Sequence, residues 1–374
     1  MIDNMPATLG IHPERRTLYV YGFPSLYGGA GTELNDQIAI WRSMGMRVHI
    51  IPTNSGYKHE PLYPEMLASG VVVHEHNGFS SIDRDAPVFG FCNSEFLENI
   101  DAIREYSTNT VFANCMTWLF EMEKKRMAEG KIRTFLYQND DVRVAQSAVL
   151  KALNPTAEVN FLTFVPYFDA LRFPFVEQRT SEFFGCGRIS RQDADKFARN
   201  TLHIYEYFVA PKFKRGLFLG FDQRSEQKIG KPYAWIRTAA DQNECSQQDF
   251  YRHCEIVLQP SDTTENWPRV GLEAMASGSI LIVDNRGGWR RQIEHGVTGW
   301  LCDHERDFIY YASKMAYEPH LRAEMACRAR DRVEPLAGAA ASQQSWTEVF
   351  KVILYPGYAA RFGRPHPSPH GNSL

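Results

Sequence analysis

The sequence lacks the segments that would carry it into or across a membrane. No run of about 18 apolar residues occurs, so we expect no transmembrane helix. The first residues, Met1–Pro6, show no basic region followed by an apolar one, so no secretory signal peptide is expected. These absences predict a cytoplasmic protein.

The chain also lacks a strong excess of one charge and any cysteine pair with metal-ligand spacing. The net charge of −3 creates no overall field that would attract nucleic acid or anionic lipid. No C-x-x-C motif occurs, so buried, reduced thiols and no bound metal are expected. The seven cysteines are scattered along the chain: Cys92, Cys115, Cys186, Cys245, Cys254, Cys302 and Cys327.

The dinucleotide-binding fingerprint G-x-G-x-x-G is missing as well. The early loop Gly28-Gly29-Ala30-Gly31 has a different glycine spacing, and the next predicted strand, Arg47–Thr53, ends without the acid that binds a ribose. Chemistry dependent on NAD is therefore disfavoured. The small residues Gly28, Gly29 and Gly31 would let the backbone approach a ligand closely, although a connecting turn has the same composition.

Short apolar runs alternate with longer amphipathic ones from end to end. This pattern is typical of parallel sheets with crossover helices. The alternation runs through one cycle up to Val159–Val165 and restarts at Phe183–Arg188. The sequence thus predicts two doubly wound α/β domains, at 1–172 and 173–342. The region 343–374 would hold a last helix, Ser345–Leu354, and a tail rich in proline, glycine and histidine.

The segment from Glu265 to Gly278 is the most informative of the chain. Two carboxylates, Glu265 and Glu273, bracket the start of a predicted helix, with Asn266 or Trp267 as its N-cap and Pro268 in the first turn. The first-turn amides have no partner within the helix and, together with the helix dipole, attract phosphate. Acids on both sides suit sugar hydroxyls, so the segment predicts a site for a nucleotide sugar.

Two cations follow the first strand of the second predicted domain. Arg188 ends that strand and Lys196 opens the next predicted helix, Asp195–Phe208, so both belong to the edge where α/β sheets bind ligands. Fixed cations there would stabilise a diphosphate leaving group, with Arg191 as a competing candidate. Solvated surface charge is the alternative explanation.

A second glycine-rich connection, Gly287-Gly288, follows the strand Ser279–Asp284 and leads into a short helix. The two glycines would border the same ligand, and a plain connection between a strand and a helix would have the same composition.

These features, in this order, resemble the retaining glycosyltransferases of the GT-B fold, specifically the GT4 family. The family's E-x7-E motif is met by Glu265 and Glu273, and the resemblance covers the chain from about Leu18 to Asp303. The resemblance implies an α/β architecture of two Rossmann-like, doubly wound domains facing across a cleft. The C-terminal helix would cross back to the first domain, which would be the acceptor side.

The resemblance also implies roles for individual residues. Glu265 would bind hydroxyls of the donor sugar, Glu273 would hold the nucleotide ribose, and Arg188 and Lys196 would meet the diphosphate. The remaining donor-binding positions would be Gly28, Gly29, Gly31, Arg191, Asn266, Arg269, Val270, Gly287 and Gly288.

Three positions depart from the family's pattern. The histidine that often follows a strand in the middle of the first domain is absent, and either Asn139 or Asp140, after the strand Thr134–Tyr137, would take its place. Pro268 replaces the usual glycine inside the acid-pair motif. The interval between Arg188 and Lys196 is longer than usual.

The resulting hypothesis is a retaining transfer from a UDP- or GDP-sugar to an acceptor hydroxyl on one face of the sugar, with no metal and no cofactor beyond the donor. A nucleotide-sugar epimerase and a nucleotide-sugar-binding pseudoenzyme are the alternatives. The acceptor would be a glycan, a lipid-linked sugar, a small molecule or a modified DNA base.

Other motifs have simpler explanations. Asp83-Arg84-Asp85 matches the D-x-D metal motif of a different glycosyltransferase fold but lies in a polar loop, and His74 and His76 lack a nearby third ligand. The apolar and basic stretch Trp118–Lys131 would allow peripheral contact with a membrane, although a packed helix with a solvated basic face has the same pattern.

Overall fold

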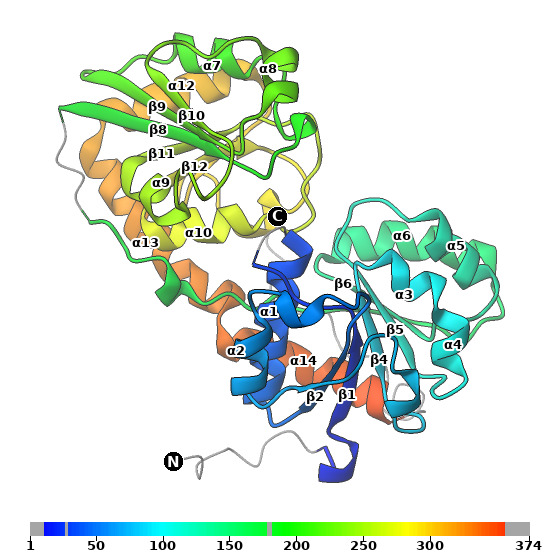
Figure 1. Cartoon of the computed structure of the whole chain (residues 1–374). Coiled ribbons are helices and arrows are strands. Elements are labelled where there is room, and N and C mark those ends of the chain that lie inside the picture. The colour runs from blue at the N-terminus through cyan, green and yellow to red at the C-terminus, as the bar shows by residue number, and fades with distance from the viewer. Residues whose placement is uncertain (1–10, 27–28, 178–181, 356–374) are drawn as a thin grey trace. The chain divides into compact units, whose positions relative to one another are not determined.

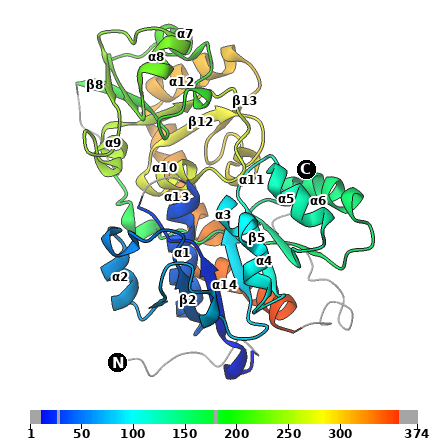
Figure 2. The same ribbon diagram turned by 45° about the vertical axis from the view of Figure 1, so that its right-hand side comes forward.

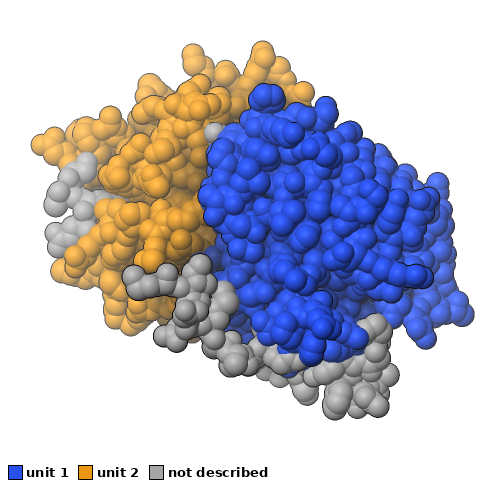
Figure 3. Space-filling model, turned by 60° about the horizontal axis from the view of Figure 1, so that its bottom comes forward, with its two compact units in different colours: residues 1–167, 339–374 blue, residues 168–338 orange. Residues whose placement is uncertain are grey.

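The computed structural model describes residues 11–26, 29–177 and 182–355. It divides into two compact units, shown as ribbons in Figure 1 and in separate colours in Figure 3. Unit 1 comprises Met1–Tyr167 and Ala339–Leu374, and unit 2 comprises Phe168–Gly338. Gly28 and the tail Gly357–Leu374 lie outside the described residues.

Unit 1 is built on a parallel sheet of seven strands in the order β3-β2-β1-β4-β5-β6-β7. The order reverses between β1 and β4, as in doubly wound sheets. The strands are β1 (Thr17–Tyr21), β2 (Arg47–Ile51), β3 (Val72–Val73), β4 (Val88–Phe91), β5 (Thr110–Asn114), β6 (Thr134–Tyr137) and β7 (Asn160–Thr163).

Helices cover both faces of this sheet, because its strands carry apolar residues on both sides. Buried residues of the helices join the two sets of strand side chains into two separate apolar clusters. One face carries α1 (Gly29–Ser43), α2 (Tyr63–Ala68) and α14 (Ala339–Leu354), and the other carries α3 (Ser94–Glu98), α4 (Ile100–Arg104), α5 (Glu121–Ala128) and α6 (Asp140–Leu153).

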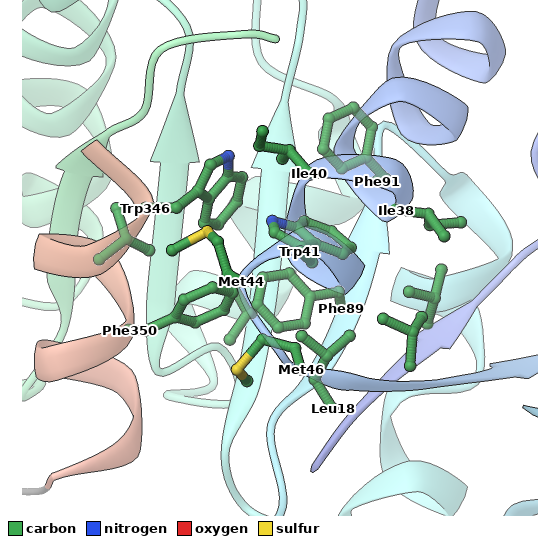
Figure 4. Packing of buried hydrophobic residues seen from close by; sticks show 14 of the residues in the cluster. Leu18, Ile38, Ile40, Trp41, Met44, Met46, Phe89, Phe91, Trp346 and Phe350 are labelled. Atoms are coloured by element: carbon green, nitrogen blue, oxygen red, sulfur yellow. The ribbon is translucent and has the colours of Figure 1, made fainter. Parts of the chain in front are cut away.

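The last helix, α14, belongs to unit 1 although it follows unit 2 in the chain. Trp346 is buried against Trp41 and Phe350, with its ring centroid 4.9 Å from that of Trp41 (Figure 4). Its indole N–H also donates to the side chain of Gln37 at 2.6 Å. The predicted return of the C-terminal helix to the first domain is therefore present.

Unit 2 repeats the architecture with six parallel strands in the order β10-β9-β8-β11-β12-β13. Figures 1 and 2 show α7, α8 and α12 on one face of the sheet and α9, α10 and α13 on the other. The strands are β8 (Phe183–Ile189), β9 (Phe213–Leu219), β10 (Ile236–Ala239), β11 (Ile256–Gln259), β12 (Ile280–Asp284) and β13 (Trp300–Cys302). The helices are α7 (Thr201–Tyr207), α8 (Gln223–Ile229), α9 (Gln247–His253), α10 (Arg269–Ser277), α11 (Trp289–Gln292), α12 (Glu305–Tyr317) and α13 (Pro319–Ala337).

The structure differs from the sequence-based expectations at several helix ends. The stretch Arg306–Arg332 is two helices, α12 and α13, because Pro319 disfavours helical geometry at Glu318, which has φ −113° and ψ 70°. Helix α14 begins at Ala339 instead of Ser345. The expected helix Asp195–Phe208 is a 3-10 turn at Ala194–Lys196 followed by α7.

The division between the units follows Tyr167 and Gly338, where the sequence placed it after residues 172 and 342. The backbone N–H of Phe168 donates to the carbonyl of Ala337 at 2.8 Å, and the Phe168 ring stacks on Phe173. These contacts attach the segment after Tyr167 to unit 2. Among the described residues, no helix combines the length and the apolar composition needed to cross a membrane.

Candidate functional site

The best-defined group of candidate residues lies in unit 2, around the start of α10. This helix begins at Arg269, and Pro268 is its N-cap with φ −73° and ψ 106°. The expected N-cap at Asn266 or Trp267, with Pro268 inside the first turn, is therefore wrong by one or two positions. Proline offers no capping side chain, and the Gly271 N–H donates back to the Pro268 carbonyl at 3.0 Å.

The glycine pair Gly287-Gly288 packs directly against the backbone that precedes α10. The Gly288 N–H donates to the Glu265 carbonyl at 2.7 Å. A Cβ added to Gly288 would lie 2.1 Å from the Asn266 carbonyl oxygen, and one added to Gly287 would lie 2.4 Å from that of Glu265. Gly287 also has a φ of +56°, which favours glycine. The two glycines thus let this turn fix the position of Glu265.

Two of the predicted catalytic residues are in direct contact. The Lys196 ammonium lies 2.6 Å from Glu265 Oε1, with both side chains about one-fifth exposed, at 22% and 21%. Lys196 reaches Glu265 from the 3-10 turn, whose N-cap Asp193 accepts the Asp195 N–H at 3.0 Å. Although Arg188 and Lys196 lie further apart in the sequence than is usual in the family, the Lys196 side chain still reaches Glu265.

Arg188 is a core residue and not a surface charge. Its side chain is 1% exposed, with the guanidinium carbon 3.9 Å from the centre of the Phe197 ring. One terminal nitrogen donates to the Pro260 carbonyl at 3.0 Å, while Nε has no hydrogen-bond partner among the described residues. Burial lowers the pKa of Arg188 to about 10, which leaves the group charged at neutral pH.

Glu273 is buried on the side of α10 that packs against α9. Its Oε2 accepts hydrogen bonds from the Tyr251 hydroxyl at 2.9 Å and from the Gln247 amide at 3.3 Å. Burial, with the adjacent Glu273 carboxylate, raises the pKa of Tyr251 well above its usual range. Tyr251 therefore stays a donor to Glu273 at neutral pH and holds the carboxylate in place.

The other predicted donor-binding residues of unit 2 have different surroundings. Arg191 is more than half exposed and bonds Asp193 through Nε and a terminal nitrogen at 3.2 and 3.0 Å. The Arg269 guanidinium lies over the Phe168 ring at 5.8 Å, Asn266 is buried, and Val270 is half-buried.

Sequence reasoning missed a second acid at this edge of the sheet. Asp284 ends β12, and its Oδ2 accepts the Ser261 N–H at 2.9 Å and lies 3.6 Å from the Arg286 guanidinium. Burial raises the Asp284 pKa to about 6, against the opposing effect of Arg286. Its place at the carboxyl end of a parallel strand was the available signal. For Tyr251 and Gln247, which hold Glu273, the sequence offered no signal apart from their spacing of four residues on α9.

Unit 1 contains the remaining predicted residues. Asn139 is buried and caps α6, accepting the Asp141 N–H at 2.8 Å, whereas Asp140 is partly exposed and accepts from Arg143 Nε at 2.7 Å. A Cβ on Gly31 would lie 2.7 Å from that of Ser25, so glycine is needed there, while Gly29 faces open space.

A buried polar cluster lies at the carboxyl end of β5 in unit 1. Glu123 of α5 accepts both Asn114 Nδ2, at 2.9 and 3.2 Å, and the Phe120 N–H, at 3.1 Å. Asn114 Nδ2 also donates to Gln146 at 3.1 Å, and its Oδ1 accepts the Met116 N–H at 2.7 Å. Burial raises the pKa of Glu123 to about 7, although these hydrogen bonds favour the ionised form. The cluster fixes the loop that follows β5.

The histidines and the D-x-D motif do not form a metal site in the described parts of the chain, where no group of three or more His, Cys, Asp or Glu side chains is arranged to hold an ion. His74 pairs with His49, their ring nitrogens lying 2.9 Å apart, and His76 contacts the Thr53 carbonyl at 3.0 Å.

Comparison with solved structures identifies the fold. The structure has the GT-B fold, as predicted from the sequence. It matches a glycosyltransferase from Rickettsia africae with a TM-score of 0.69 at 14% identity, over 91% of this chain and 99% of that one. Anabaena HepE in complex with UDP-glucose matches with a TM-score of 0.67 at 13% identity, over 89% and 99%.

The family-model match lies within unit 2. Residues 242–332 match the model of the family described as "Glycosyl transferases group 1". Human alpha-1,3/1,6-mannosyltransferase ALG2 is 30% identical over 133 residues, which are 34% of this chain and 30% of that protein. The D-inositol 3-phosphate glycosyltransferase of Pseudarthrobacter chlorophenolicus is 29% identical over 113 residues, which are 30% of this chain and 25% of that protein. The chain therefore shares its fold with known glycosyltransferases and, within residues 242–332, shares sequence with the group 1 glycosyl transferases.

The first prediction concerns the contact between the glycine pair and Glu265. We expect Gly288→Ala to destabilise unit 2 by about 1–3 kcal/mol, because the added methyl group meets backbone that has no room to move. Urea unfolding checks this. Gly29→Ala, where the Cβ meets no atom within 4 Å, is the matched control. Equal stability of the two variants would contradict the packing described above.

The second prediction concerns pH. The folded pKa of Glu123, about 7, lies above the ordinary value of 4.5, so the folded protein binds this proton more tightly than the unfolded chain. Its contribution to the free energy of unfolding is therefore complete below about pH 4.5 and is lost as pH rises to about 7, by at most about 3 kcal/mol.

Urea unfolding between pH 4.5 and 8 measures this effect as the difference between wild type and Glu123→Gln. This difference in the free energy of unfolding should change between pH 4.5 and about 7 and be constant above pH 7. Glu121→Gln, at an exposed position on the same helix, should run parallel to wild type. A Glu123→Gln curve that also runs parallel would show that Glu123 is ionised throughout.

Proposed function

We propose that this protein is a retaining glycosyltransferase of the GT4 type. It would move a sugar from a UDP- or GDP-sugar to an acceptor hydroxyl. The observation that carries the proposal is the contact between Lys196 and Glu265 ahead of α10, together with the buried charge of Arg188, which interacts electrostatically with Glu265. The matched segment 242–332 and the UDP-glucose bound to HepE support the same conclusion.

The paired charges suit a donor whose diphosphate and sugar bind side by side. In the free protein, Lys196 and Glu265 neutralise each other. With donor bound, a diphosphate oxygen would replace Glu265 as the partner of Lys196, and hydroxyls of the sugar would replace Lys196 as partners of Glu265. Because each charged group would exchange one partner for another and neither would be left buried without a partner, this exchange is energetically accessible.

The reaction would proceed on one face of the sugar. The bond between the anomeric carbon and the diphosphate oxygen breaks, and a bond from that carbon to the acceptor oxygen forms on the same face. The acceptor proton passes to the departing diphosphate. Lys196 and the field of Arg188 would stabilise the negative charge that develops there, which is a contribution of about 3 kcal/mol for one such contact. No metal is needed in this scheme.

Glu273 would accept hydrogen bonds from the ribose, because Tyr251 and Gln247 hold its carboxylate in one orientation. In unit 1, Asp140 is the more suitable of the two residues proposed to replace the family's histidine. Asn139 uses its side-chain oxygen to cap α6, while the Asp140 carboxylate is partly exposed.

The third prediction tests nucleotide binding. Glu273→Ala should weaken binding of the preferred nucleoside diphosphate by tenfold or more, because a buried carboxylate that accepts from the ribose is lost. Isothermal titration calorimetry measures the affinity. Glu226→Ala, which removes an exposed acid of α8 in the same unit, should bind like wild type. Unchanged affinity for Glu273→Ala would count against the assignment of the acid pair.

The fourth prediction tests turnover. A thermal-shift screen of UDP- and GDP-sugars should identify a donor, since a ligand at a hundred times its Kd stabilises by about 2.7 kcal/mol. That donor should be consumed in the presence of glycan, lipid-linked, small-molecule or modified-DNA acceptors. Product NMR should show a retained anomeric configuration, and EDTA should leave the rate unchanged.

Other outcomes identify the alternatives. A donor isomerised without acceptor would establish an epimerase, and binding without turnover on any acceptor would establish a pseudoenzyme. Inversion at the anomeric carbon would overturn the retaining scheme.

A further inference from the structure

Helix α6 of unit 1 packs Leu150 into the core but also buries polar side chains and leaves apolar ones exposed. It buries polar side chains, with Gln146 at 4% exposure, and presents valines to solvent, with Val144 at 55% and Val149 at 50%. Alanines occupy the rest of the exposed side. We call Val144, Ala145, Ala148, Val149 and Ala152 the outer face of α6; all five are exposed.

The polar cluster beneath β5 sets this orientation. Gln146 accepts a hydrogen bond from Asn114 and donates another to the Met116 carbonyl, each at 3.1 Å. Rotating the helix to bury Val144 and Val149 would break both bonds inside the unit, which costs more than exposing two valines. The outer face is therefore a fixed surface and not a product of loose packing.

The outer face is continuous, unlike the scattered apolar residues of an ordinary surface. Its members lie at positions i, i+1, i+4, i+5 and i+8, which form one stripe along the helix. Inside unit 1, α6 packs against α5 and the strands β6 and β7, and β7 is the last strand of the sheet. Contiguous exposed apolar residues are a feature of interaction surfaces, whereas single scattered ones are not.

The charges of α6 indicate which partner fits. The helix carries Asp140 and Asp141 at its start and Arg143 and Lys151 further along, so its net charge is zero. A bilayer surface would require an excess of cations, which the helix lacks. An identical helix running antiparallel would instead bring Asp141 of one copy to the level of Lys151 of the other. A parallel pair would align like charges.

We propose that the outer face of α6 pairs with the same face of a second copy of this chain, in an antiparallel arrangement about a two-fold axis. The alanines allow the two helix axes to approach closely, and the valines pack on either side of them. Lys151 is exposed, with its ammonium 5.3 Å from the centre of the Phe161 ring, at the border of this surface. One helix covers less than the roughly 800 Å² per partner of a standard interface, so the dimer is weak and depends on concentration.

Sedimentation velocity of the full chain over a range of concentrations tests the pairing. Wild type should shift reversibly from monomer to dimer, and Val149→Glu should abolish the shift, because two buried carboxylates would face an apolar surface. Leu67→Glu is the matched control, since Leu67 of α2 is also an exposed apolar residue of unit 1, at 47%. It should dimerise like wild type.

A charge exchange tests the antiparallel register. Asp141→Lys and Lys151→Asp should each weaken dimerisation by about tenfold, because the two-fold axis doubles the effect of each change. The double variant should restore it. Melting temperatures of all variants separate this effect from a loss of folding.

Three results would overturn the proposal. They are a wild type that stays monomeric throughout, a dimer that is insensitive to Val149→Glu, and a double variant as weak as the single ones. Co-flotation of wild type with anionic phospholipid vesicles, lost in Val149→Glu, would identify a bilayer as the occupant instead. The pairing does not depend on the proposed transferase activity, so the two can fail separately.

Discussion

The structure of the candidate site depends on one backbone contact, the hydrogen bond from the Gly288 N–H to the Glu265 carbonyl at 2.7 Å. Through it, the turn after β12 holds the segment that precedes α10. Only glycine permits this approach, because a Cβ at either position would overlap a carbonyl oxygen. The start of α10, the carboxylate of Glu265 and its contact with Lys196 all follow from that packing.

Several charged groups at this edge of the sheet of unit 2 already have partners within the protein. Lys196 contacts Glu265, Arg191 contacts Asp193, and Asp284 accepts from the Ser261 amide. Burial would raise the Asp193 pKa, but hydrogen bonds from Arg191 and the Asp195 amide outweigh it and hold the pKa below its usual value. A polar ligand at this edge would therefore exchange partners with groups whose positions are already set.

Unit 1 uses its buried polar groups in a different way. Asn114, Glu123 and Gln146 bond to one another and to the loop after β5, and they also fix the rotation of α6. One cluster thus shapes the carboxyl end of the sheet and, as a consequence, exposes an apolar helix face. Satisfying buried hydrogen bonds is worth more than covering a few valines, so the polar interior decides which side of the helix meets solvent.

The sequence by itself determined the fold class, because the alternation of apolar runs with amphipathic ones is a local property of the chain. It also singled out the segment from Glu265 to Gly278 as the proposed donor site, from residue types and spacing alone. It placed the N-cap of α10 at Asn266 or Trp267, whereas the N-cap is Pro268, and it predicted one helix where α12 and α13 are separate. Single residues at helix ends decide such boundaries. Only the tertiary structure decided that Lys196 contacts Glu265, that Tyr251 holds Glu273, and that α6 turns Val144 and Val149 outward. Each of these depends on residues far apart in the chain, and no local pattern encodes their distances.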